Sequence, residues 1–213
     1  IVMTLGREVS TKGSTFTIRR FRDEPFTPVD LLEFKTFSSM QIAFFWLAMQ
    51  YGMSMLFVGG TASGKTTSLN ACSLFLPWQH KIVSIEETRE LNLPHPNWIP
   101  GCTRQGFGGE SAGSGVKAAG EVDMYDLLRA ALRERPEYII VGEIRGAEAY
   151  VLFQAMATGH TTYSTFHADS IQSLVHRLEN KPIEIPRVLI PALDGISIQI
   201  QTRVGGKRVR RNK

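Results

Sequence analysis

The sequence has 213 residues, of which 43% are hydrophobic and 21% charged, and its mean hydropathy is −0.08. This balance is typical of a globular domain and excludes disordered and fibrous chains. The formal net charge is +4, but five positive residues among the last seven account for more than all of it, so the body of the chain is not a strongly basic nucleic-acid surface. Cys72 and Cys102 lack C-x-x-C spacing, which excludes a disulfide framework, argues against a cysteine zinc site and favours a reduced, cytosolic compartment.

The first patterned segment spans residues 15–22 (TFTIRRFR), where apolar and polar residues alternate. This period predicts a half-buried strand, which we expect to belong to a unit upstream of the main domain. Pro25 and Pro28 then interrupt the chain, and Thr27 is placed to cap a short helix. We therefore expect a domain boundary within residues 23–30.

Residues 40–60 contain no charged side chain and are long enough to cross a membrane as one helix. Gly52 divides this stretch into a part of helix length and a part of strand length. We therefore expect a buried helix over 41–51 and a buried strand over 55–58, and no direct membrane span.

The remaining pattern alternates strands with helices. Strands are predicted at 81–85, 138–141 and 162–166, and a late strand at the alternating residues Ile196, Ile198 and Ile200. Helices are predicted at 124–133 after Asp123, at 147–157, and at 171–179 after Ser170. A hairpin turn is predicted at 204–207, with its return strand over 208–211. This order predicts an α/β fold with a mostly parallel, helix-covered sheet.

Residues 59–66 (GGTASGKT) match the phosphate-loop pattern of glycine, four residues, then Gly-Lys-Thr, and they follow an apolar run. Glycines in such a loop let backbone N–H groups turn toward phosphate oxygens, and the next helix directs its positive end at them. We expect Lys65 to reach the β- and γ-phosphates of ATP and the Thr66 hydroxyl to bind Mg²⁺. The predicted phosphate-binding residues are Gly59, Gly60, Thr61, Ala62, Ser63, Gly64, Lys65, Thr66 and Thr67.

Acidic residues follow two of the predicted strands. Glu86 and Glu87 come after 82–85, and Glu143 comes after 139–142. An open parallel sheet binds its ligand at the carboxyl ends of the strands, where a carboxylate can hold the water ligands of a metal or accept a proton from attacking water. The alternative is that these acids are solvated strand ends, and the residues alone leave both open.

His160 and His167 flank the predicted strand 162–166. They lack the helical i, i+4 spacing of a zinc pair and have no cysteine partners, so we expect no zinc site. Isolated histidines are usually structural; the functional alternative is a polar contact to the γ-phosphate or to a neighbouring subunit.

Four separated motifs together resemble the secretion and pilus ATPases of the type II/type IV machinery. They are 59–66 as the Walker A loop, 82–91 (IVSIEETREL) as the Asp box, 139–145 (IIVGEIR) as an atypical Walker B motif, and 158–168 (TGHTTYSTFHA) as the His box. The stretches 13–21, 92–100 and 125–136 are most similar to archaeal members, the pilus or secretion motors and the archaellum motor. The resemblance covers nearly the whole chain.

This resemblance implies a RecA-like P-loop NTPase fold. Residues 1–22 resemble the last strands of the family's N-terminal domain, residues 23–37 its linker, and residues 38–213 its RecA-like ATPase domain without the final elements.

The resemblance also implies roles for individual residues. Lys65 and Thr66 would hold phosphate and Mg²⁺, Glu86 would act as the base for water, and Glu143 would support the metal, partly through water. Glu87 stands where the family usually has Asp, which leaves open whether Glu86 or Glu87 is the base.

Other residues would act between domains or subunits. His160 and His167 would contact the nucleotide site or couple it to neighbouring subunits. Arg19 matches an arginine that the family brings to the γ-phosphate, and Arg104 and Arg145 are further candidates. Arginines supplied by a moving domain make hydrolysis depend on domain position.

As a whole, the resemblance implies a ring-shaped homohexamer that binds ATP and Mg²⁺ at the cytoplasmic face of the cell membrane and pushes on an inner-membrane platform protein to assemble or secrete subunits. Two alternatives remain. The first is a RecA-like nucleic-acid translocase, suggested by the phosphate loop and the basic segment 207–213; the second is an assembly module that binds nucleotide without hydrolysis. A hairpin strand explains the basic segment more simply, so we expect no nucleic-acid partner.

Overall fold

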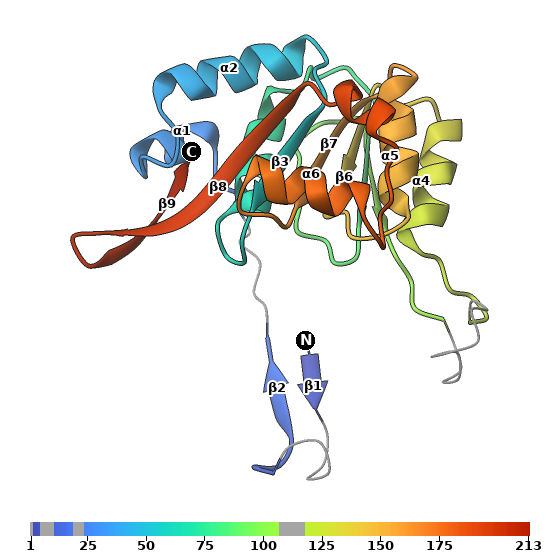
Figure 1. The fold of residues 1–213 in the computed structure, drawn as a ribbon, viewed down its shortest axis with the longest axis horizontal. Helices are drawn as coiled ribbons and strands as arrows, with labels where there is room; N and C mark the ends of the chain where they lie inside the picture. The colour runs from blue at the N-terminus through green and yellow to red at the C-terminus, as the bar shows by residue number, and fades with distance from the viewer. Residues whose placement is uncertain (1, 5–10, 19–23, 107–117) are drawn as a thin grey trace.

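The computed structural model describes residues 2–4, 11–18, 24–106 and 118–213. Its main feature is a seven-stranded sheet of order β5-β4-β6-β7-β3-β8-β9, in which only the β8–β9 pair is antiparallel (Figure 1). The strands are β3 (Met55–Gly59), β4 (Ile82–Glu86), β5 (Trp98–Cys102), β6 (Tyr138–Val141), β7 (Thr161–Phe166), β8 (Gly195–Val204) and β9 (Lys207–Asn212). The predicted α/β class with a mostly parallel sheet is confirmed.

Six α-helices accompany the sheet in the described ranges. They are α1 (Pro28–Glu33), α2 (Ser39–Gln50), α3 (Lys65–Cys72), α4 (Met124–Arg133), α5 (Glu148–Ala157) and α6 (Ile171–Glu179), with short 3₁₀ turns at η1 (Ser73–Phe75) and η2 (Arg187–Ala192). Side-chain caps begin four of these helices, because Thr27, Ser38, Asp123 and Ser170 each accept a hydrogen bond from a first-turn N–H. The caps Thr27, Asp123 and Ser170 were predicted from the sequence, and for α2 the sequence allowed either Ser38 or Ser39, of which Ser38 is the cap.

The core lies in two layers, one on each face of the sheet. One hydrophobic cluster joins the sheet to α4, α5 and α6, and the other joins it to α1, α2 and α3 (Figure 1). Strand β3 contributes to both, because Leu56 and Val58 belong to the first cluster and Met55 and Phe57 to the second. A strand buried on both faces needs no alternating polar residue, which explains its continuous apolar sequence.

The uncharged stretch 40–60 forms a helix and a strand, as predicted. Helix α2 ends at Gln50, and β3 begins at Met55 after Gly52, whose φ of +69° places it in the left-handed region. In the described part of the chain, no helix combines the length and the apolar composition needed to cross a bilayer.

Strand β5 was not predicted. It pairs in parallel with β4 at the edge of the sheet, and its side chains are only half-buried or exposed. Pro100 lies within it, and a proline lowers the strand signal because it lacks a backbone donor, although an edge strand tolerates it.

The segment before the main sheet is described in two parts. Strands β1 (Val2–Thr4) and β2 (Thr15–Thr17) form a separate antiparallel pair. Farther along, Leu31 of α1 and the following Phe37 are each 3% exposed and belong to the cluster with α2 and α3. The segment predicted as a linker therefore packs in part on the main body, and the boundary at 23–37 stays a prediction.

Candidate functional site

The phosphate loop connects β3 to α3, as its sequence context predicts. Helix α3 begins after Gly64, whose φ of +98° suits glycine, and no side chain caps its first N–H groups. The Ser63 hydroxyl and the Lys65 Nζ both donate to the Gly60 carbonyl, at 2.8 and 2.9 Å. A side chain at Gly60 would meet nothing within 4 Å, so open space adjoins the loop. The loop thus offers free backbone donors to an anion.

Residues 61–68 line a cavity of about 930 Å³, which we call the P-loop cavity. The loop and the start of α3 line one side, and the carboxyl ends of β4 and β6 line another. Acidic side chains at its wall are Glu86, Glu87, Glu90 and Glu143. Basic side chains at its wall are Lys65, Arg145, Arg208, Arg210 and Arg211. A cavity with both kinds of wall suits a polyphosphate bound together with a divalent cation.

Burial shifts the pKa of Lys65 below its ordinary value, and the nearby Glu143 carboxylate opposes this shift. The amine lies at the P-loop cavity on the first turn of α3. An added anion would stabilise its charged form, so the partly buried amine is prepared for phosphate.

Glu86 is the buried acid of the site, with 2% of its surface exposed. Its Oε1 accepts hydrogen bonds from the backbone N–H groups of Glu90 and Leu91, at 2.9 and 3.0 Å. Its Oε2 is buried and has no partner within the described residues. Burial raises the pKa of this carboxyl, and the two amides oppose that shift. A fixed carboxylate with one unused oxygen at a cavity wall can accept a proton from water.

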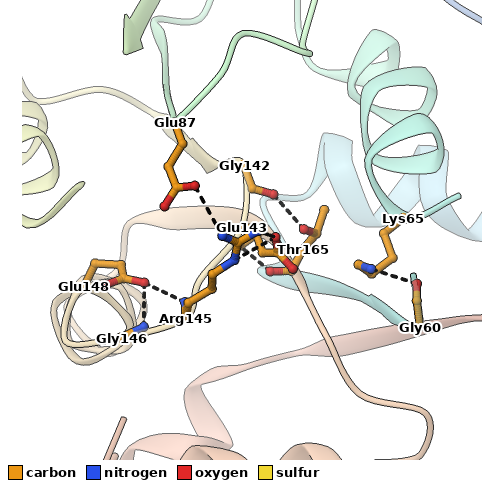
Figure 2. A network of polar contacts seen from close by, with 10 residues as sticks. Gly60, Lys65, Glu87, Gly142, Glu143, Arg145, Gly146, Glu148 and Thr165 are labelled. Carbon is orange, nitrogen blue, oxygen red and sulfur yellow. Dashed lines mark hydrogen bonds and ion pairs between the residues drawn. The ribbon is translucent and has the colours of Figure 1, made fainter. Parts of the chain in front are cut away.

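Arg145 lies between two acids, Glu143 and Glu87 (Figure 2). Its Nε donates to Glu143 Oε2 at 3.0 Å, its Nη2 donates to the same oxygen, and its Nη1 lies 3.3 Å from Glu87 Oε2. The bond to Glu143 raises the pKa of the Arg145 guanidinium above its ordinary value. The backbone beside it is also fixed, because Glu148 accepts from the N–H groups of Arg145 and Gly146 at 2.6 and 2.8 Å.

Of the remaining predicted site residues, some line the P-loop cavity and others do not. His167 lines the P-loop cavity at the carboxyl end of β7, whereas His160 precedes the amino end of that strand and does not line the cavity. Because β7 runs parallel to β3, its amino end lies on the side of the sheet opposite to the phosphate loop, which follows the carboxyl end of β3. The expected contact of His160 to nucleotide within its own chain is therefore not supported by its position. Arg104 donates to the Gly120 carbonyl at 2.8 Å, away from the cavity wall, and Arg19 lies outside the described residues.

A family model described as "Type II/IV secretion system protein" matches residues 7–204. The chain belongs to this family. It is 48% identical over 186 residues to the uncharacterized protein MJ1287 of Methanocaldococcus jannaschii, covering 87% of this chain and 66% of that protein. It is 34% identical over 177 residues to the type IV secretion system protein PtlH of Bordetella pertussis, covering 76% of this chain and 49% of PtlH. The VirB11 ATPase of the Brucella suis type IV secretion system has a similar structure, with a TM-score of 0.64 at 26% identity, over 90% of this chain and 56% of VirB11.

The type II/IV secretion family therefore accounts for both the motif order and the RecA-like α/β fold. The chain spans less than two thirds of the length of the curated relatives that it matches.

Sequence reasoning missed two groups of residues that line the P-loop cavity. Arg208, Arg210 and Arg211 all line it from β9, and Phe26 and Phe34 line it from the segment before α2. The two phenyl rings pack edge to face with centroids 5.3 Å apart. The basic composition of residues 207–213 was visible in the sequence. Their position at the P-loop cavity was not, because strand β9 reaches the phosphate loop only through long-range strand pairing.

The site also fits Mg²⁺ in the manner expected of a nucleotide-bound ion. Within the described ranges, no group of three or more His, Cys, Asp or Glu side chains could hold a metal by itself. Mg²⁺ usually keeps several waters and binds one or two protein ligands together with substrate phosphates. Thr66 and Glu143, which line the cavity, match this limited ligand set.

Proposed function

We propose that this chain is the ATPase domain of a motor that drives a type IV pilus, an archaellum or a type II secretion machine. It hydrolyses Mg²⁺-ATP as part of a homohexameric ring at the cytoplasmic face of the membrane, and its domain motions act on an inner-membrane platform protein. We further propose that residues 1–22 belong to an N-terminal domain, that 23–37 link it, and that 38–213 form the ATPase domain.

The observation that carries this proposal is the P-loop cavity, where Lys65 on one side faces acids from two adjacent strands. In the proposed roles, Lys65 and the loop amides hold the phosphates and Thr66 and Glu143 support Mg²⁺. Glu86 accepts the proton of the attacking water through the buried oxygen that has no partner. His167, which lines the same cavity, contacts the terminal phosphate in this proposal. The ATPase activity of VirB11, a relative in fold and sequence, agrees with this assignment.

The nucleic-acid translocase is the weaker candidate. Its main support was the basic segment 207–213, which forms strand β9 paired along its length with β8. Three of its arginines line the P-loop cavity, so a nucleic-acid partner is not needed to explain the positive charge of this segment. The assembly module without hydrolysis loses support from Glu86, because this buried carboxylate lines the P-loop cavity and its Oε2 has no hydrogen-bond partner among the described residues.

Replacing Lys65 by alanine tests the proposed function. The purified protein, including its N-terminal domain, is expected to release phosphate from ATP in the presence of Mg²⁺, and Lys65→Ala is expected to reduce this rate at least about 100-fold because a phosphate cation is lost. Phosphate release under saturating Mg²⁺-ATP is the measurement. Lys207→Ala, a change of an exposed lysine at the hairpin tip, is the matched control and should leave the rate unchanged. Equal turnover in Lys65→Ala and the unmodified protein would rule the ATPase proposal out.

A further inference from the structure

We propose that Arg210 of the C-terminal hairpin binds the phosphates of the nucleotide and that its bond to the phosphate loop holds its guanidinium in place for this contact. This inference rests on the proposed nucleotide site and adds a phosphate ligand that comes from the end of the chain rather than from the motifs.

The topology brings Arg210 to the loop from far away in sequence. Strand β8 pairs with β3 up to Gly59, opposite Gln199, and then continues beyond the end of β3. Gly205 and Gly206, with φ of +56° and +77°, turn the chain back so that Arg210 pairs with Gln201. The return strand β9 therefore runs beside the phosphate loop, which begins where β3 ends.

Direct contacts hold the Arg210 side chain against this loop. Its Nε donates to the carbonyl oxygen of Ala62 at 2.9 Å, across 148 positions of sequence. Its Cδ lies 3.0 Å from where a Cβ would stand on Gly64, so the aliphatic stem packs on the loop backbone. Ala62 itself has a φ of +58°, in the left-handed region that residues other than glycine seldom adopt.

The other end of the guanidinium is available to a ligand. Arg210 lines the P-loop cavity, and among the described residues its two Nη nitrogens have no hydrogen-bond or ion-pair partner. Its neighbour Arg211 differs, because its Nη1 donates to the carbonyls of Phe34 and Arg210 at 3.1 and 2.7 Å. Arg210 therefore combines a fixed stem with free donors.

The chemistry of these donors suits phosphate. A guanidinium presents its N–H groups in a rigid planar fork, so the Nε bond to Ala62 sets the direction of the Nη groups. Such a fork binds phosphate oxygens through two parallel charge-assisted hydrogen bonds. The acids Glu86, Glu87, Glu90 and Glu143 also line the cavity, but no ion pair to Arg210 is formed with any of them in the described residues.

The test is nucleotide affinity, measured by calorimetry with Mg²⁺-ATP, Mg²⁺-ADP and AMP on Arg210→Ala, Arg210→Lys and Arg203→Ala. Arg203 is the matched control, an exposed arginine of β8 in the same hairpin that does not line the cavity. Loss of a charged hydrogen-bond donor is expected to weaken ATP and ADP binding roughly 10- to 100-fold in Arg210→Ala. AMP, which lacks the outer phosphates, should bind all variants within about twofold. Arg210→Lys should fall between Arg210→Ala and the unmodified protein, because an ammonium keeps the charge without the fork.

Thermal unfolding of each variant shows whether it is folded. If the unmodified protein and Arg203→Ala bind ATP and Arg210→Ala binds it equally well, the inference fails while the proposed function stands. An equal loss for AMP and ATP would also overturn it, because the arginine would then act on the whole site rather than on phosphates. Full ATP affinity in Arg210→Lys would overturn the role of the fork. If the unmodified protein binds neither ATP nor ADP, the proposed function itself fails.

Discussion

Glu86→Gln is expected to lower ATP hydrolysis at least about 100-fold, within the range that a general base contributes, while Mg²⁺-ATP affinity changes by less than about threefold. Glutamine keeps the shape of the side chain and an oxygen that can accept from the N–H groups of Glu90 and Leu91. It cannot accept a proton from water at neutral pH. Single-turnover phosphate release, together with nucleotide binding, separates the loss of chemistry from a loss of affinity.

Glu87→Gln is the matched control for this prediction. The Glu87 side chain is exposed and its described contact is the ion pair to Arg145, a contact of small energetic value at the surface. It should retain hydrolysis within about threefold, since it removes no buried base. If Glu87→Gln lost activity and Glu86→Gln kept it, the two acids would have to exchange roles.

The raised pKa of Glu86 also predicts how the Glu86→Gln substitution changes the free energy of unfolding. Because the carboxyl has a higher pKa in the folded than in the unfolded chain, the folded state binds its proton more tightly. The stabilisation from this proton is therefore complete below the unfolded pKa and is lost as pH rises through the folded pKa. At neutral pH the buried charge opposes folding, so Glu86→Gln should raise the free energy of unfolding there and flatten its dependence on pH in the acid range. A lower stability of this variant at pH 7 would contradict the assignment of the shift to burial.

Gly59→Ala is expected to destabilise the protein by roughly 2–3 kcal/mol, the effect of forcing an extra carbon into a closely packed site. A Cβ on Gly59 would lie 2.3 Å from the backbone oxygen of Gln199 and 2.5 Å from Ser63 Oγ. The first atom belongs to the paired strand β8, so β3 and β8 would have to separate. The second belongs to the phosphate loop, so nucleotide affinity should fall as well. The free energy of unfolding in denaturant and calorimetry with Mg²⁺-ADP are the measurements.

Gly60→Ala provides the comparison, because the added carbon would meet nothing within 4 Å. Its free energy of unfolding should remain within about 0.5 kcal/mol of the unmodified protein, as for other substitutions that meet no steric conflict. Equal stability of Gly59→Ala and Gly60→Ala would show that β3 and β8 do not approach as closely as the structure has them.

Strand β9 contacts both the phosphate loop and the segment around the end of α1. Arg210 donates to Ala62 in the phosphate loop, Arg211 donates to Phe34 at the end of α1, and the Asn212 N–H donates to the Thr36 carbonyl at 2.9 Å. Three consecutive residues thus connect the nucleotide loop to the segment proposed as the interdomain linker.

Local sequence patterns determined most of the elements of this protein and the chemistry of its main loop. The helix 124–133 after Asp123 was predicted with its observed bounds, because a capping side chain and a helical apolar period are encoded within a dozen residues. The phosphate loop was equally evident, since its residues and flanking elements are contiguous. Strand β5 was not predicted, because a half-exposed edge strand that contains proline shows no clear alternation of apolar and polar residues.

Only the tertiary structure decided how separated residues are used. Strand β4 is buried on both faces, and Glu86 is its last residue, whereas Glu87 lies beyond the end of the strand and is exposed. The fold therefore places Glu86, and not Glu87, in the buried position. The same parallel order places His167 at the cavity and His160 at the far end of β7. Arg210 reaches Ala62 because β8 pairs with β3, and such pairing depends on contacts between segments more than a hundred residues apart. No local sequence pattern predicts which strand pairs with β3, because the free energy that determines the pairing comes from burying whole faces of the sheet.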